Sequence, residues 1–276
     1  RAMSKRFFDA INGPFGKTMI GHLDQSTADS LNRDFRTFHH AGQLPPDSDW
    51  RTWLIMAGRG FGKTRAGAEW VLTQVRAHPG CRIALVAATL DEARRVMVEG
   101  PSGLLRLAKD TEIHQWSAAQ RTLWFKNGGE VTVFSGANPE GLRGPEHHFA
   151  WADELAKWKH PVDCWNNLQM GLRMGESPRA VVTTTPRALP LLRRILEAAD
   201  SVRTGGGTSQ NPHLPARFIE SMQEHYGGTR LALQELEGRL FDDVEGSLWP
   251  LELIARCRVA PALMPPARTG RWRCAW

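Results

Sequence analysis

The segment Ala57–Thr64, with the sequence AGRGFGKT, limits what this chain can fold into more than any other feature. It follows a run of apolar, β-prone residues and precedes a segment with helical spacing, so its glycines lie between a buried strand and a helix. Glycines allow the backbone to curl until successive N–H groups point at one place, and the following helix adds the positive end of its dipole. This arrangement is typical of a loop that binds phosphate groups.

The residue types inside this segment predict how a nucleoside triphosphate binds. We expect Lys63 to reach the β- and γ-phosphates and the Thr64 hydroxyl to hold Mg²⁺, which makes ATP and Mg²⁺ the predicted cofactors. The usual first glycine of the pattern is Ala57 here, a tolerated change because that position only begins the turn. The predicted nucleotide-binding residues of the segment are Gly58, Arg59, Gly60, Phe61, Gly62, Lys63 and Thr64.

A pair of carboxylates about 90 residues after this loop indicates where hydrolysis takes place. The segment His148–Glu154 is an apolar, strand-like run that ends in Asp153 and Glu154. Asp153 is expected to bind Mg²⁺ through water, and Glu154 is expected to polarise the attacking water as a general base. An apolar run ending in two acids is common where a strand meets solvent, but its place downstream of a phosphate-binding loop favours the functional interpretation.

Two further features suit the same chemistry. Thr183, Thr184 and Thr185 end another apolar run, and their hydroxyls are candidates to sense the γ-phosphate and relay hydrolysis to motion. The alternative is that β-branched residues simply favour a strand. Gln43, twenty residues before Lys63, is placed to read an adenine edge, and the alternative is an ordinary solvated glutamine.

The alternation of β-rich runs and helical segments predicts an α/β fold with a mostly parallel sheet flanked by helices. The expected strands are Thr52–Ala57, Arg82–Ala88, Glu130–Phe134, Phe149–Ala152 and Ala180–Thr184. The expected helices are Thr64–Ala77, Asp91–Met97, Pro190–Ala199, Ala216–Glu224 and Thr229–Gly238. The segment Ser201–Pro215 is rich in Gly, Ser, Asn and Pro, which predicts a loop or hinge.

Together these motifs resemble the large terminase subunits of tailed phages and gene transfer agents, the motors that pump DNA into capsids. The resemblance covers roughly residues 40 to 250, in the segments Trp53–Val71, Leu142–Trp158, Val181–Arg187 and His225–Trp249. It implies a P-loop NTPase of the ASCE class, with a strand added between the P-loop strand and the Walker B strand, and a small C-terminal lid or linker. It also implies that Thr183–Thr185 form the coupling motif.

The same resemblance implies partners and a further site residue. The partners are double-stranded DNA, a portal protein, a small terminase subunit and a ring of identical subunits, in the cytoplasm of a bacterial host. Arg143, ten residues before Asp153, resembles the arginine that reaches into a neighbouring subunit's site. Arg59, acting in cis, is the competing candidate, and a structural ion pair is a third interpretation of Arg143.

The predicted organisation has four parts: an N-terminal segment (1–40), a P-loop ATPase core (41–200), a lid/linker segment (201–255) and a tail (256–276). The tail lacks periodicity and is expected to be disordered or foreign to the fold. In the resembling family a two-metal nuclease follows the lid, whereas this chain holds no carboxylate set for two metals after Trp249. We therefore expect ATPase activity and no nuclease activity.

Charge and cysteine content add weaker constraints. The 35 Lys and Arg residues against 29 Asp and Glu give a net charge of +6, which favours an anionic partner only slightly because the basic residues are dispersed. The four cysteines are scattered, which disfavours disulfides and structural zinc, and no apolar stretch is long enough for a membrane span. The predicted function is an ATP-hydrolysing DNA translocase; the alternatives are a helicase-like P-loop ATPase and a truncated nucleotide-binding remnant that does not translocate.

Overall fold

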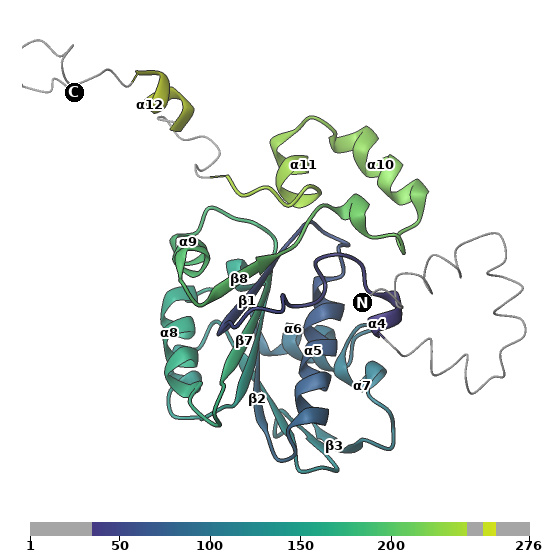
Figure 1. Cartoon of the computed structure of the whole chain (residues 1–276), viewed down its shortest axis with the longest axis vertical. Helices are drawn as coiled ribbons and strands as arrows, with labels where there is room; N and C mark the ends of the chain where they lie inside the picture. Colours follow the sequence, from purple (N-terminus) through teal and green to yellow (C-terminus); the bar gives the residue numbers. More distant parts are fainter. Residues whose placement is uncertain (1–34, 242–250, 258–276) are drawn as a thin grey trace, which may run out of the picture. The chain divides into compact units, whose positions relative to one another are not determined.

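The computed structural model describes residues 35–241 and 251–257 (Figure 1). Internal contacts divide the chain into residues 1–240 and residues 241–276, and each part is described by itself. The predicted N-terminal segment (1–40) and tail (256–276) lie mostly outside the described residues, as do positions 242–250 of the predicted lid/linker segment. The predicted division into four parts stays a prediction. In the second part, α12 (Leu251–Cys257) is the described element.

An eight-stranded sheet forms the centre of the first part, in the order β3-β4-β5-β2-β6-β7-β1-β8. The strands are β1 (Thr52–Met56), β2 (Arg82–Ala87), β3 (Ile113–Ser117), β4 (Thr122–Phe125), β5 (Glu130–Ser135), β6 (Phe149–Asp153), β7 (Arg179–Thr184) and β8 (Ser201–Thr204). In this order, each pair of neighbouring strands from β5 through β2, β6, β7 and β1 to β8 is parallel. Strands β3 and β4 form an antiparallel edge beside β5. This architecture confirms the predicted α/β class with a mostly parallel sheet.

The position of β7 decides how the two predicted motifs meet. It lies between β1, which precedes the glycine-rich loop, and β6, which ends at Asp153. In the register, Thr183 of β7 is opposite Ile55 on one side and opposite Asp153 on the other. The sheet therefore has the added strand that the ASCE class requires.

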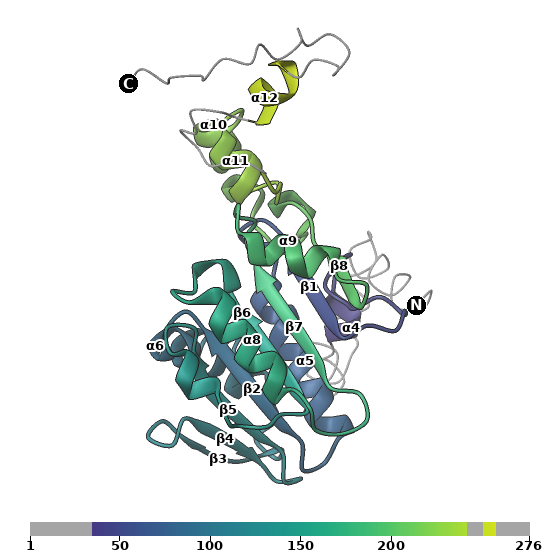
Figure 2. The same cartoon turned by 90° about the vertical axis from the view of Figure 1, so that its left-hand side faces the viewer.

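Helices cover both faces of the sheet (Figures 1 and 2). Side chains alternate along a strand, so Trp53 and Ile55 belong to one buried cluster and Leu54 and Met56 to another. The long helix α5 (Lys63–Ala77) packs in the first cluster, and α8 (Pro161–Gly171) and α9 (Pro190–Glu197) pack in the second.

The remaining helical elements are short or lie after the sheet. They are α4 (Phe35–Phe38), α6 (Leu90–Glu92), the π-helix η1 (Ala93–Val98), α7 (Leu104–Leu107), the 3₁₀ helices η2 (Pro139–Leu142), η3 (Leu155–Lys157) and η4 (Thr208–Gln210), and the pair α10 (Ala216–Tyr226) and α11 (Arg230–Glu235). Among the described residues, no helix is both long and apolar enough to cross a membrane.

The five predicted strands are confirmed to within one residue at each end, whereas β3, β4 and β8 were not predicted. The prediction of a loop throughout Ser201–Pro215 is wrong at its start, because residues 201–204 pair with β1 and form the edge strand β8. This short strand has no apolar alternation of its own, so its pairing with a buried neighbour decides its conformation.

Two predicted helices differ from the structure, and one helix of the structure was not predicted. The segment Asp91–Met97 divides between α6 and a π-helix, and α8 was not predicted at all. The helix predicted for Thr229–Gly238 ends at Glu235, because the carbonyl of Leu236 accepts a hydrogen bond from the N–H of Thr208, at 2.6 Å. A tertiary hydrogen bond thus replaces the last helical turn.

Candidate active site: a glycine-rich loop beside two carboxylates

The glycine-rich segment forms the connection between β1 and α5. Gly60 and Gly62 have φ values of 74° and 92°, a left-handed conformation that residues with a Cβ rarely adopt. Gly62 is the N-cap of α5, and Lys63 is the first residue of that helix. The loop and the positive end of the helix therefore lie together, which is the arrangement that binds anions.

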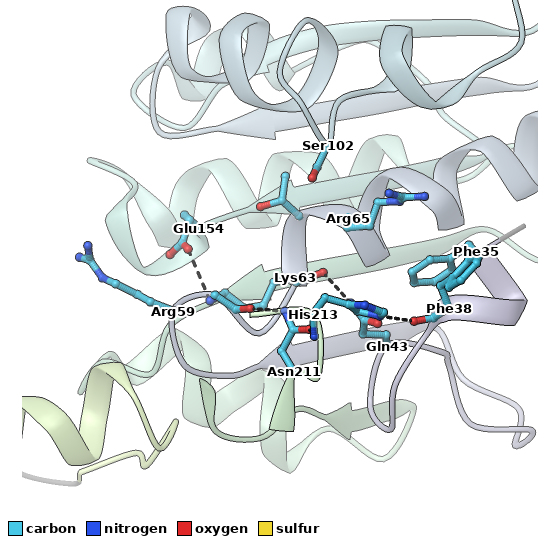
Figure 3. Close-up of a pocket in the computed structure, with 13 residues that line it drawn as sticks. Phe35, Phe38, Gln43, Arg59, Lys63, Arg65, Ser102, Glu154, Asn211 and His213 are labelled. Atoms are coloured by element: carbon cyan, nitrogen blue, oxygen red, sulfur yellow. Dashed lines mark hydrogen bonds and ion pairs between the residues drawn. The ribbon is translucent and has the colours of Figure 1, made fainter. Parts of the chain in front are cut away.

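Lys63 places a buried positive charge inside this loop. Its side chain is 7% exposed, and its Nζ donates to the carbonyls of Ala57 at 3.0 Å and Gly58 at 3.1 Å. Nζ also lies 3.8 Å from a carboxylate oxygen of Glu154, and Figure 3 shows the two side chains pointing toward one another. Burial lowers the pKa of the Lys63 ammonium, and the charges of Glu154 and Asp153 oppose that change.

Asp153 is the last residue of β6 and is buried. Its Oδ1 accepts a hydrogen bond of 2.5 Å from the Thr183 hydroxyl. Burial raises the pKa of Asp153 to about 7, while the Thr183 bond and the Lys63 charge act in the opposite direction. A bound cation would favour the ionised carboxylate, and carboxylate and hydroxyl oxygens, here those of Asp153 and Thr64, are ligands that Mg²⁺ prefers. These donor types suit a magnesium ion; Thr64 lines the pocket beside the loop and Asp153 does not, so their joint binding of Mg²⁺ stays a prediction.

Glu154 has an unusual backbone conformation directly after β6. Its φ of 45° and ψ of 47° are left-handed, and the one other non-glycine with positive φ in the described chain is Arg121. Such a conformation costs on the order of 1–2 kcal/mol for a residue with a Cβ. Glu154 Oε2 accepts from the N–H of Thr185 at 3.3 Å and from its hydroxyl at 3.4 Å. The strained turn and these contacts fix the direction of a carboxylate that is 21% exposed.

The three predicted coupling threonines are all buried. They contact different parts of the turn formed by Asp153 and Glu154, which we call the acidic turn. Thr183 binds the carboxylate of Asp153, and Thr185 binds the carboxylate of Glu154. The Thr184 hydroxyl accepts from the N–H of Ala156, at 3.3 Å. These contacts show that the threonines do more than favour a strand, while their part in coupling stays a prediction.

Trp151 joins the two motifs, a role that its apolar surroundings in the sequence did not indicate. Its indole N–H donates to the Thr183 hydroxyl at 2.9 Å. Its ring lies so close to α5 that a Cβ on Gly67 would be 2.3 Å from it. The strand that carries Asp153 is thereby packed directly on the helix that begins at Lys63.

A pocket of about 600 Å³ opens beside the loop (Figure 3). It suits a ligand of nucleotide size. Of the predicted site residues, those that line it are Gln43, Arg59, Gly60, Gly62, Lys63, Thr64 and Glu154. It is also lined by Phe35, Phe38, Arg65, Ser102, Asn211 and His213, which were not predicted.

Gln43 is 5% exposed and lines this pocket, but both ends of its amide are engaged. Its Oε1 accepts from the N–H of His40 at 3.1 Å, and its Nε2 donates to the carbonyl of Gly62 at 3.2 Å. The structure thus gives Gln43 a contact with the loop, and the reading of an adenine edge stays a prediction.

The two candidate arginine fingers lie in different surroundings. Arg59 is 68% exposed and donates to a carboxylate oxygen of Glu235, 2.7 Å away. Arg143 is 74% exposed and lies 3.6 Å from the carboxylate of the equally exposed Glu140. An exposed pair of this kind contributes little free energy, so it leaves the Arg143 side chain available to another partner. Arg143 is not among the described residues that line the pocket of its own chain.

Comparisons of the sequence and of the fold identified known proteins that are similar to this chain. Residues 54–256 match the family described as terminase large subunit, T4likevirus-type, N-terminal. No protein of curated function matches the sequence.

Three of the similar solved structures are large terminases of bacteriophages. The ATPase domain from Thermus phage P74-26 has a TM-score of 0.58 at 17% identity, covering 83% of this chain and 98% of that one. The protein of a thermophilic bacteriophage, in complex with ADP, has a TM-score of 0.60 at 16% identity, covering 72% and 52%. The HK97 large terminase has a TM-score of 0.55 at 14% identity, covering 79% and 51%. The chain spans about half the length of the full large terminases it matches.

Proposed function

Because the chain belongs to the large terminase family, in the part described as N-terminal, we propose that it is the ATP-hydrolysing motor domain of a large terminase, which translocates double-stranded DNA into a capsid. The observation that carries this proposal is the buried ammonium of Lys63, held by the glycine-rich loop 3.8 Å from the carboxylate of Glu154. A buried cation next to a strained, partly exposed carboxylate is the pair that binding and cleaving a triphosphate requires.

In the proposed mechanism the loop N–H groups and Lys63 bind the β- and γ-phosphates. Thr64 and Asp153 would hold Mg²⁺, which neutralises phosphate charge when bound. Glu154 accepts a proton from water as the water oxygen attacks the γ-phosphorus, and the bond from that phosphorus to the β–γ bridging oxygen breaks to release ADP. Thr185 keeps the Glu154 carboxylate in position for this transfer.

The proposed coupling runs through β7. This strand is paired with both β1 and β6, and it ends at the threonines that hold Asp153 and Glu154. A change in the acidic turn on loss of the γ-phosphate would therefore reach the strand next to the loop. The partners that this proposal implies are double-stranded DNA, a portal protein, a small terminase subunit and a ring of identical subunits.

Steady-state phosphate release tests the proposal. With ATP and Mg²⁺ the chain is expected to release phosphate, and linear double-stranded DNA is expected to raise the rate. Stimulation by single-stranded DNA alone would favour a helicase-like ATPase. Nucleotide binding with no phosphate release under any of these conditions would contradict the motor and favour a remnant that binds without turnover.

We also propose that Arg143 supplies an arginine finger to a neighbouring subunit, since its exposed side chain has only a weak partner among the described residues. Mixing Lys63→Ala subunits with Arg143→Ala subunits should restore hydrolysis that neither variant has alone, because the first keeps the finger and the second keeps the site. A finger contributes ~10³-fold or more in rate, so the gain is measurable by phosphate release. Turnover that is independent of protein concentration, with no recovery on mixing, would favour Arg59 in cis.

A further inference from the structure

Two side chains from the segment after β8 hold backbone carbonyls of the glycine-rich loop. The Thr208 hydroxyl donates to the carbonyl of Arg59 at 2.6 Å. Asn211 Nδ2 donates to the carbonyl of Gly60, also at 2.6 Å. Thr208 is 4% exposed, so its bond is shielded from water. These contacts join residues about 150 positions apart in the sequence.

Two side chains from the segment before β1 hold the next two carbonyls. His40 Nε2 lies 2.7 Å from the carbonyl of Phe61, and Gln43 Nε2 donates to the carbonyl of Gly62. Burial lowers the pKa of His40, which favours the neutral ring with a single N–H. Nε2 has the shorter of the two carbonyl contacts, since Nδ1 is 3.1 Å from the carbonyl of Ala41, so the tautomer with its proton on Nε2 donates to Phe61.

Four successive carbonyls of the loop, from Arg59 to Gly62, are therefore held from outside. In a trans peptide unit the carbonyl and the following N–H point in opposite directions. Fixing the direction of these carbonyls therefore also fixes the direction of the N–H groups of Gly60, Gly62 and Lys63, the type of group from which a phosphate accepts hydrogen bonds.

The segment that provides Thr208 also connects to the helical pair α10 and α11, which we call the α10–α11 hairpin. The N–H of Gly58 donates to the carbonyl of Gly206 at 3.0 Å, and the N–H of Thr208 donates to the carbonyl of Leu236 at 2.6 Å. A Cβ on Gly58 would be 2.4 Å from that Leu236 oxygen, so the loop and the end of the hairpin are in direct contact.

The hairpin itself is weakly packed. None of the 11 residues of α10 is buried, and Ala232 is the buried residue of α11. An element with few buried apolar contacts opens locally at low free-energy cost, so its order depends on the few polar contacts that anchor it. Here such contacts join Glu235 of the hairpin to the phosphate-binding loop: its carbonyl accepts from the N–H of Arg59 at 2.6 Å, and its carboxylate accepts from the Arg59 guanidinium at 2.7 Å.

We propose that Thr208, Asn211 and His40 are positioning residues that hold the loop in its phosphate-binding form and thereby link nucleotide binding to the order of the α10–α11 hairpin. The inference rests on the proposed function, since it assumes that the loop binds a nucleotide. By thermodynamic linkage, a ligand that stabilises the loop geometry also stabilises the attachment of the hairpin, and loss of that attachment weakens binding of the ligand.

The first test is the affinity of the full chain for ADP, measured by calorimetric titration. Thr208→Val keeps the shape of the side chain and removes the hydroxyl, and Asn211→Ala removes the amide. Each is expected to weaken ADP binding ~3–10-fold, the effect of one lost hydrogen bond. Thr208→Ser should bind nearly as well as the wild type. His40→Phe keeps a ring beside Phe61 and should weaken binding to a similar extent.

The chain provides matched controls away from the loop. Thr122 in β4 is likewise buried and donates its hydroxyl to a backbone carbonyl, that of Gln120. Asn127 donates to the carbonyl of Val75 at 2.7 Å and accepts from a nearby N–H, as Asn211 does in its own turn. Thr122→Val and Asn127→Ala should leave ADP affinity unchanged, which separates loop positioning from a general loss of stability.

The second test is hydrogen–deuterium exchange of residues 216–235 with saturating ADP. In the wild type, ADP should slow exchange throughout the α10–α11 hairpin, and the Thr208→Val/Asn211→Ala double variant should lose this protection although its site is filled. ADP binding by the wild type with unchanged hairpin exchange, or wild-type affinity in the variants, would overturn the inference alone. A wild-type chain that binds no ADP would overturn the proposed function as well.

Discussion

Replacing Lys63 with alanine is expected to abolish ATP hydrolysis, with a fall of at least ~100-fold in kcat/KM. Lys63 is the buried cation at the glycine-rich loop, and its ammonium already lies at hydrogen-bond distance from two loop carbonyls. With a triphosphate bound, the same ammonium would face the β- and γ-phosphates, so the variant loses charge compensation in both the ground state and the transition state. Phosphate release with ATP and Mg²⁺ measures the effect.

The control for this change is Lys126→Ala, which removes an exposed lysine between β4 and β5 and should leave hydrolysis unaltered. Thermal unfolding of both variants establishes that the loss is not a loss of fold. A Lys63→Ala chain that keeps more than a tenth of wild-type hydrolysis would show that the loop does not bind the reacting phosphates.

Replacing Glu154 with glutamine is expected to stop hydrolysis while nucleotide binding persists. The amide has the shape of the carboxylate and can still accept from Thr185, but it cannot take a proton from water. A lost general base lowers the rate by ~10²–10⁴-fold. Binding is expected to be retained or tighter, because Lys63 loses its carboxylate neighbour and is free to face the phosphates.

Titration with a fluorescent ATP analogue, together with single-turnover hydrolysis, separates these two effects. Glu176→Gln is the control, since Glu176 is exposed and lies in the connection between α8 and β7. If Glu154→Gln abolishes binding together with turnover, then Glu154 is a ligand or a structural residue and another group must act as the base.

Local sequence patterns were sufficient to predict the central part of the fold. The glycine spacing of Ala57–Thr64, the buried run before it and the helical spacing after it are short-range features, and each follows from the conformational preferences of the residues concerned. The same holds for the run that ends at Asp153 and for the run that ends at Thr185. The parallel sheet, its five adjacent strands from β5 to β1 and the family were therefore predicted correctly.

Edge strands and the supporting side chains were not predictable in this way. Strands β3 and β8 have few apolar residues, and their conformation comes from pairing with a neighbour that is distant in the sequence. The contact of Thr208 with the loop spans 149 positions, and that of Asn211 spans 151. No short-range pattern of residue types in the sequence indicates such contacts.

The sequence by itself thus determined which groups perform the chemistry: a lysine in a glycine-rich turn and two carboxylates at the end of an apolar strand. The tertiary structure decided how those groups are held. It placed β7 between the two motifs, gave Asp153 and Glu154 a threonine each, and turned the loop carbonyls toward Thr208 and Asn211. The physical reason is that backbone conformation follows mainly from neighbouring residues, whereas a buried polar group takes its hydrogen-bond partner from whichever segment the packed sheet brings beside it.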